Sequence, residues 1–293
     1  MANSDQWWSN ETIAVVTGGN RGIGLEIVRQ LAEKGVTTVL TSRNIEQGHL
    51  AVEQLKAKGL HNVAFHRLDV TDSRSAQELA AWIKQKYGGL DILINNAGIV
   101  SYFHDDKKQG AVDVIETNYY GVKKVIESLL LVIKPSKFGG RIINVSSRLG
   151  LLKDFRSEEL KAMISNEMLS ESVIDSFLKN FLADVSNGQI TSKGWPTIDL
   201  EGRGPEAYSD YCVSKIALNA YTRVLAHEFL SRAYGEKVYV NVVCPGYTQT
   251  DMTLGMGNNT VEEGADTVVW LALLPPSELP SGKFLAERTE VSF

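Results

Sequence analysis

The sequence predicts an α/β protein with a doubly wound parallel sheet, because strand-like and helical segments alternate along the chain. Short apolar and β-branched runs are each followed by a segment with apolar residues at helical spacing, and the joins are short. The length of 293 residues and a hydrophobic fraction of 43% are ample for one large core. We therefore expect a single domain over residues 1–293, with a ligand site beyond the carboxyl ends of the strands.

Composition and charge argue against several classes of protein. The formal net charge is −5 and no basic block offsets it, which disfavours a nucleic-acid partner. No apolar run has the length of a signal peptide or a membrane span, so we expect a cytoplasmic protein without membrane contact. The two cysteines, Cys212 and Cys244, fit a reducing compartment and cannot build a disulfide framework.

A glycine-rich stretch follows the first predicted strand, Ile13–Val16, and precedes a helix whose apolar spacing begins at Leu25. Gly18, Gly22 and Gly24 give the pattern G-x-x-x-G-x-G. Glycines let the backbone approach a ligand closely, and the unpaired N–H groups of a helix N-terminus attract a pyrophosphate. The pattern predicts a dinucleotide site; a glycine turn that binds nothing is the alternative.

The second predicted strand, Thr37–Thr41, bears on the choice of dinucleotide. A carboxylate near the end of this strand is typical of NAD sites, whereas Ser42 and Arg43 stand here and Arg21 lies in the glycine turn. Two guanidiniums without a carboxylate suit a 2′-phosphate, because arginine makes bidentate, charge-assisted bonds to phosphate. We therefore predict a preference for NADPH, and two solvated surface arginines are the alternative.

The remaining elements continue the alternation. Helices are expected at Glu46–Lys58, Ser73–Tyr87 and Glu262–Leu273, and strands at Val63–Leu68, Asp91–Ile94 and Lys283–Leu285. Thr71 or Asp72 is expected to cap the helix that begins at Ser73. Three motifs each fall at the end of a strand, where ligands bind in such sheets. They are the glycine turn, Asp69-Val70 and the Asn-Asn-Ala-Gly run from Asn95.

These motifs, in their order and spacing, resemble the short-chain dehydrogenase/reductase family. TGGNRGIG, LDV and NNAG are followed by ETNYYG, a Ser-x-x-Gly, YCVSK and CPGYT, so the match covers nearly the whole chain except one insertion. The resemblance implies that Asn118 is the active-site asparagine, Ser147 the catalytic serine, and Tyr211 and Lys215 the Tyr-x-x-x-Lys pair. Ser146 is the alternative to Ser147.

The chemistry of these residue types suits hydride transfer to a carbonyl group. Tyr211 and Lys215 lie one helical turn apart and face the same side. We expect the ammonium to lower the pKa of the phenol toward working pH, which makes Tyr211 a general acid for the carbonyl oxygen. Ser147 can donate a second hydrogen bond to that oxygen. The resemblance implies that Asn118 holds the helix backbone and a water that links Lys215 to solvent.

The resemblance also implies the contacts of an NADPH cofactor, and we expect no metal site. Asp69 would accept from the adenine amino group, Thr248 would bind the carboxamide, and Asn95 is expected to be structural. The expected cofactor-binding residues are Gly18, Asn20, Arg21, Gly22, Ile23, Gly24, Arg43, Asp69, Val70, Asn96, Ala97, Gly98, Tyr211, Lys215, Pro245, Gly246 and Thr248.

An insertion separates Ser147 from Tyr211, which are 64 positions apart where ordinary family members have little more than a dozen. It runs over 151–206 and contains two predicted helices, Glu158–Leu169 and Ser172–Val185. This departure resembles a subgroup of monomeric carbonyl reductases that includes plant alkaloid and terpenoid reductases. Because an amphipathic helix on an apolar face removes the reason to associate, we expect a monomer.

The substrate pocket is expected over the nicotinamide. Its candidate residues are Val100, Tyr102, Phe103, Leu149, Met252, Leu254 and Met256. They are apolar or aromatic, which favours a hydrophobic ketone or aldehyde over a sugar or an acid. The sequence thus predicts an NADPH-dependent carbonyl reductase. An epimerase-type relative and a non-catalytic NADP(H)-binding regulator are the alternatives; the first is disfavoured by the glycine spacing, the second by the complete catalytic set.

Overall fold

The strands form one eight-stranded sheet in a computed structural model that describes residues 6–102, 104–166, 168–199, 202, 204 and 206–292. Its order is β3-β2-β1-β4-β5-β6-β7-β8, and every pairing is parallel except that of β7 with β8. The strands are β1 (Ile13–Val16), β2 (Thr37–Ser42), β3 (Val63–Arg67), β4 (Ile92–Asn95), β5 (Gly140–Val145), β6 (Val238–Cys244), β7 (Phe284–Ala286) and β8 (Thr289–Val291).

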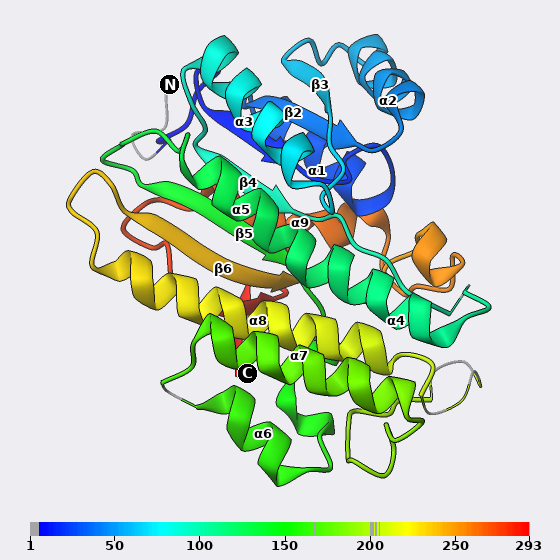
Figure 1. Cartoon of the computed structure of the whole chain (residues 1–293). Helices are drawn as coiled ribbons and strands as arrows, with labels where there is room; N and C mark the ends of the chain where they lie inside the picture. The colour runs from blue at the N-terminus through cyan, green and yellow to red at the C-terminus, as the bar shows by residue number, and fades with distance from the viewer. Residues whose placement is uncertain are drawn as a thin grey trace.

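Helices cover both faces of this sheet, as a doubly wound fold requires (Figure 1). The helices are α1 (Gly22–Glu33), α2 (Ile45–Ala57), α3 (Ser73–Tyr87), α4 (Lys107–Ile115), α5 (Val122–Leu130), α6 (Glu158–Ser165), α7 (Glu171–Ser186), α8 (Ser209–Leu230) and α9 (Val261–Leu273). Short helical segments are η1 (Glu116–Gly121), η2 (Arg148–Gly150), η3 (Leu152–Asp154) and η4 (Asp251–Thr253). The predicted fold class is confirmed.

Two hydrophobic cores lie on the two faces, and the alternation of strand side chains decides which residue enters which core. Val15 points into the core formed with α3, α5 and α8, whereas its neighbours Ala14 and Val16 point into the core formed with α1, α2 and α9. Ile142 and Ile143 of β5 divide in the same way. Strands buried on both faces are continuously apolar, which is why the short apolar runs of the sequence identified them.

Helices α6 and α7 lie within the predicted insertion and pack on the α8 side of the molecule (Figure 1). Helix α7 contacts α4 and α8, and α6 lies outside α7. Trp195 is fully buried, its ring centroid 5.0 Å from that of Phe177 and 5.1 Å from that of Phe181. Helix α6 ends earlier than predicted because Asn166 leaves the helical conformation and its side chain accepts from the Met168 N–H.

The edge of the sheet differs from the prediction, because β8 pairs antiparallel with β7 and the sequence analysis contains no such strand. The hairpin turn between them consists of Glu287 and Arg288, at φ angles of 51° and 59°. The bounds predicted for the other elements agree within a few residues, whereas no bounds were predicted for β5, β6, α4, α5 and α8. Asp72 rather than Thr71 caps α3 by accepting from the Arg74 N–H. Within the described ranges, none of the helices combines the length and apolar character of a membrane span.

Candidate active site

The conformation of the glycine turn between β1 and α1 is set by the backbone angles of its glycines and by the side-chain amide of Asn96. Gly18 and Gly22 have φ angles of 63° and 53°, in the left-handed region that glycine adopts readily. A Cβ atom on Gly24 would lie 2.3 Å from the Gly18 carbonyl oxygen and 2.4 Å from Nδ2 of Asn96. Only glycine fits at position 24, so the start of α1 can lie close against the turn.

The Asn-Asn-Ala-Gly run after β4 supports that turn. Asn96 Nδ2 donates to the carbonyl oxygens of Thr17 at 3.0 Å and Gly18 at 3.2 Å. The Thr17 hydroxyl accepts in return from the backbone N–H groups of Asn96 and Ala97. Asn95 is buried and donates to Asn144 Oδ1 at 2.9 Å, in agreement with the structural role expected for it.

A cavity of about 900 Å³ lies at the carboxyl ends of the strands, where the sequence analysis expects the ligand. Its walls include every residue predicted to bind the cofactor: Gly18, Asn20, Arg21, Gly22, Ile23, Gly24, Arg43, Asp69, Val70, Asn96, Ala97, Gly98, Tyr211, Lys215, Pro245, Gly246 and Thr248. Segments that are far apart in the sequence therefore meet around one space large enough for a dinucleotide and a small molecule.

The two arginines of the proposed phosphate site differ in their contacts. Arg43 follows β2, is exposed and lines the cavity. Arg21 also lines the cavity, and its Nη1 lies 2.7 Å from Oδ2 of Asp251 in η4, with side chains 71% and 75% exposed. The Arg21–Asp251 pair is exposed, so it is weak and can exchange with another anion.

Asp69, another predicted cofactor residue, accepts through Oδ1 from the hydroxyl and the N–H of Thr71.

Tyr211, Lys215 and Ser147 converge on the cavity from α8 and from the loop after β5. Lys215 Nζ donates to the Val145 carbonyl oxygen at 3.0 Å and lies 5.5 Å from the centroid of the Tyr211 ring. The Ser147 hydroxyl accepts from the Leu149 N–H at 3.1 Å and lies near enough to the Tyr211 phenol to lower its pKa. The Ser146 hydroxyl instead donates to Asn219 Oδ1 at 2.6 Å in the buried interior, which favours Ser147 over Ser146 as the reactive hydroxyl.

The expectation that the pKa of Tyr211 falls toward working pH is wrong. Removal from water raises the pKa of the phenol, and the nearby Ser147 hydroxyl opposes this rise only in part. Removal from water also lowers the pKa of Lys215 to about 8. The tyrosine is therefore a neutral phenol at neutral pH, which is the form that can donate a proton.

Asn118 lies behind the cavity wall and is fully buried, in the π-helical segment η1 between α4 and α5. Its Oδ1 accepts from the Ile99 N–H at 2.8 Å, and its Nδ2 donates to the Ile99 carbonyl oxygen and the Ser214 hydroxyl. The asparagine thus ties the loop after β4 to α8. Single π-helical turns are frequent at functional sites.

The candidate substrate residues divide into three groups. Val100, Leu149 and Met252 line the cavity. Tyr102 donates its hydroxyl to the Met252 carbonyl oxygen and stacks near Tyr208, and it is not among the lining residues. The expectation that Tyr102, Leu254 and Met256 line the pocket is wrong, because none of them lies in the cavity wall, and Leu254 and Met256 are about half exposed. Phe103 lies outside the described residues.

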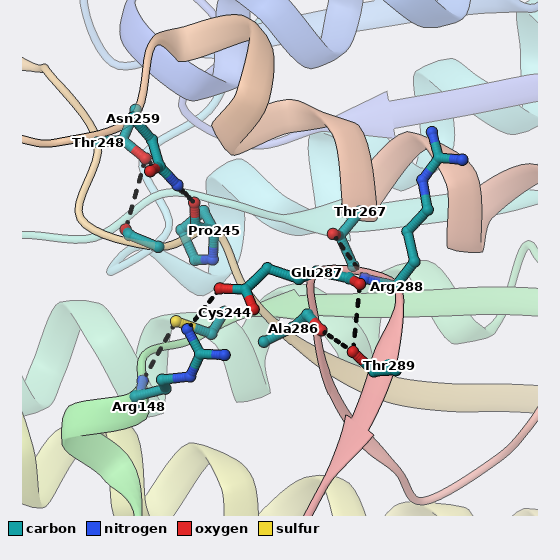
Figure 2. Close-up of polar contacts among 11 residues, drawn as sticks. Arg148, Cys244, Pro245, Thr248, Asn259, Thr267, Ala286, Glu287, Arg288 and Thr289 are labelled. Carbon is teal, nitrogen blue, oxygen red and sulfur yellow. Dashed lines mark hydrogen bonds and ion pairs between the residues drawn. The ribbon is translucent and has the colours of Figure 1, made fainter.

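Several wall residues were not identified as site residues from the sequence. They are Ser42, Leu68, Thr71, Ile99, Thr117, Val145, Ser146, Arg148, Tyr208, Cys244, Tyr247, Gln249, Thr250, Asp251 and Thr253. Most of them directly flank a recognised motif, so proximity to the motifs was the available signal. The Pro-Gly segment, which was predicted, adjoins several of these residues (Figure 2). The hydroxyl of Thr248 and Nδ2 of Asn259 both donate to its Pro245 carbonyl oxygen.

Comparisons with known proteins agree with this arrangement. A sequence profile described as short chain dehydrogenase matches residues 12–157 and 200–260 and leaves the α6–α7 segment unmatched. Short-chain dehydrogenase/reductase 1 of Saponaria officinalis is 42% identical over 100% of this chain and 99% of its own length. Carbonyl reductase 1 of Homo sapiens, whose name specifies NADPH, is 38% identical over 94% of this chain and 96% of its own. The structure of salutaridine reductase from Papaver somniferum superposes with a TM-score of 0.83 at 38% identity, covering 94% of this chain and 99% of that one.

The fold and the site together define an oxidoreductase of the Rossmann type. The chain has a doubly wound sheet, a glycine turn at the first crossover, and a Tyr-x-x-x-Lys pair that faces the same cavity as this turn. The extent of the profile match and of the identities fixes the family. The chain belongs to the short chain dehydrogenase family.

Proposed function

We propose that the protein is an NADPH-dependent carbonyl reductase that acts on apolar ketones or aldehydes, and on the corresponding alcohols in reverse. The observation that carries this proposal is the meeting of Tyr211, Ser147 and the glycine turn around one cavity. The proposed catalytic residues are Ser147, Tyr211 and Lys215, with Asn118 holding the loop beside them.

The cavity fits a dinucleotide. The turn at Gly24 has room for no side chain, as a close approach of phosphates requires. Arg43 stands at the end of β2 where an NAD site has a carboxylate, and it supports a 2′-phosphate. The human relative named above is an NADPH enzyme by its name. The proposed cofactor-binding residues are those that line this cavity, and the bound cofactor supplies the hydride.

The chain's own residues would handle the proton and the charge on the substrate oxygen. Tyr211 carries a phenol proton at neutral pH because its pKa is raised, and it would donate that proton to the carbonyl oxygen. The Ser147 hydroxyl, which lies near the phenol, would donate a second hydrogen bond to the same oxygen. The Lys215 ammonium would then stabilise the phenolate that remains, since the two side chains lie one helical turn apart.

The substrate end of the cavity supports an apolar substrate. Val100, Leu149 and Met252 contribute apolar surface beside Ser147. Salutaridine reductase, whose fold is similar, is named for an alkaloid substrate. We infer a terpenoid- or alkaloid-like ketone, or an aldehyde of similar polarity.

The assembly state and the domain boundaries follow from the insertion. Helix α7 packs against α4 and α8 and covers that face with Phe177 and Phe181, so little apolar surface remains there for a second copy. We propose a monomer, a single domain over 1–293 with the insertion over 151–206, and a cytoplasmic location. Light scattering should give the chain mass of 32.3 kDa; twice that mass would contradict the monomer.

Oxidation of NADPH with a panel of apolar ketones and aldehydes tests the activity, with NADH in parallel and product chirality recorded. Turnover with a higher kcat/KM for NADPH supports the proposal, and a preference for NADH contradicts the cofactor assignment. Tight NADPH binding without turnover on any carbonyl would favour the non-catalytic regulator.

A further inference from the structure

The C-terminal hairpin reaches the loop that carries Ser147 through one ion pair. Arg148 follows Ser147 directly, and its Nη1 lies 2.9 Å from Oε1 of Glu287 in the turn between β7 and β8. Figure 2 shows the two side chains pointing toward each other, with Cys244 at the end of β6 beside them. A segment near the C-terminus thus contacts the residue next to the reactive serine.

The tip of this hairpin has a defined position of its own. Glu287 and Arg288 both adopt left-handed backbone angles, which non-glycine residues keep only when surrounding contacts hold them. Arg288 supplies those contacts by binding the carboxylate of Asp266 on α9 and by donating its N–H to the Thr267 hydroxyl. The tip is therefore anchored to α9 independently of Arg148.

Besides the loop's own hydrogen bonds, among them that of the Leu149 N–H to the Ser147 hydroxyl at 3.1 Å, three contacts tie the loop after Ser147 to other elements. The Arg148 N–H donates to Sγ of Cys244 at 3.3 Å, and Asn219 donates to the Gly150 carbonyl oxygen at 2.9 Å. These two partners belong to β6 and α8, which are parts of the catalytic face itself. The third partner, Glu287, lies beyond residue 260, where the match to the family profile ends. Glu287 is thus a contact from outside the segment that the family profile matches.

We propose that Glu287 is a positioning residue for Ser147: by holding Arg148 it fixes the η2 loop and keeps the Ser147 hydroxyl directed at Tyr211 and at the substrate oxygen. The inference rests on the proposed reductase function. Because the Glu287 side chain is 71% exposed, the ion pair adds little to global stability. Its effect on the rate is bounded in the same way, so loss of this exposed pair can lower the rate by at most about fivefold through a small displacement of the serine.

Replacement of Glu287 tests the proposal. Glu287→Ala should lower kcat by about twofold to fivefold, as the loss of an exposed ion pair allows. The dissociation constant of NADPH in a fluorescence titration should stay within about twofold, because Glu287 is not among the residues that line the cavity. In a Ser147→Ala background the same replacement should cause no further loss, because both changes act on one hydroxyl.

Two further variants separate positioning from loss of structure. Glu290→Ala removes the ion pair with Lys283 on the same hairpin without touching Arg148 or the α9 anchor, and it should retain the wild-type kcat. Glu287→Asp keeps a carboxylate on the turn and should recover most of the lost rate.

Wild-type turnover in Glu287→Ala would overturn the inference. So would a double variant whose loss in kcat equals the product of the losses in Glu287→Ala and Ser147→Ala. Equal losses in Glu287→Ala and Glu290→Ala without recovery in Glu287→Asp would overturn it as well. An inactive Tyr211→Phe variant beside a fully active Glu287→Ala variant refutes the positioning role alone. Absence of turnover on every carbonyl would overturn both this inference and the proposed function.

Discussion

Replacing Gly24 with alanine tests whether the glycine turn is the cofactor cradle. The added Cβ would lie 2.3 Å from the Gly18 carbonyl oxygen and 2.4 Å from Asn96 Nδ2, where ordinary contact begins at 3.4 Å. Either the start of α1 or the two contacted atoms must therefore move by about 1 Å, and such overpacking costs about 1–3 kcal/mol. The same amide holds the carbonyl oxygens of Thr17 and Gly18, and each weakened hydrogen bond adds about 1 kcal/mol.

We expect the free energy of unfolding in urea to fall by about 3–5 kcal/mol from the overpacking and the two weakened hydrogen bonds. A turn displaced from the phosphates should raise the dissociation constant of NADPH by at least about tenfold, which corresponds to about 1.4 kcal/mol. Gly35→Ala is the matched control: Gly35 lies at the end of the same helix, at a φ of 86° with open space around it. It should cost about 1–2 kcal/mol of stability through backbone strain and leave NADPH affinity unchanged. If Gly24→Ala bound NADPH as tightly as the wild type does, the cradle assignment would be refuted.

Three other changes test the cofactor, the buried lysine and the insertion. Arg43→Ala should weaken NADPH binding by about tenfold and leave NADH binding unchanged in fluorescence titrations, as loss of one charge-assisted contact predicts; equal losses for both would exclude a 2′-phosphate contact. Burial lowers the pKa of Lys215 to about 8 from 10.5, so between these values the unfolded chain holds the proton that the folded protein has lost. The free energy of unfolding should therefore rise from pH 8 to pH 10 by about 2 kcal/mol more in the wild type than in Lys215→Met, and parallel pH curves for the two proteins would contradict the shifted pKa. Trp195→Ala removes a fully buried ring from Phe177 and Phe181 and should cost about 3–5 kcal/mol in urea denaturation; an unchanged midpoint would show that the insertion is not part of the core.

The parts of the molecule that follow from local sequence were predictable. Helix α3 has the predicted bounds, Ser73–Tyr87, because an acidic cap and a helical apolar period both mark it. The convergence of the glycine turn, Asp69 and Asn96 on one cavity follows from a parallel sheet, in which the carboxyl ends of the strands meet at one edge.

The parts that depend on contacts between distant segments were not predictable. Strand β8 was missed because its turn, Glu287-Arg288, lacks the glycine or asparagine that usually marks a tight hairpin. Arg21 pairs with Asp251, which lies 230 positions away, and no local pattern indicates such a partner. The pKa of Tyr211 was predicted in the wrong direction because desolvation depends on the packing around the ring.

The central claim, that the Tyr211 phenol donates the proton, is tested most directly by Tyr211→Phe in a single-turnover experiment with NADPH and a ketone that the wild type reduces. The account predicts that the dissociation constant of NADPH stays within about twofold, while the rate of NADPH oxidation falls by at least about 100-fold, as loss of a general acid requires. A near wild-type rate in this variant would contradict the account.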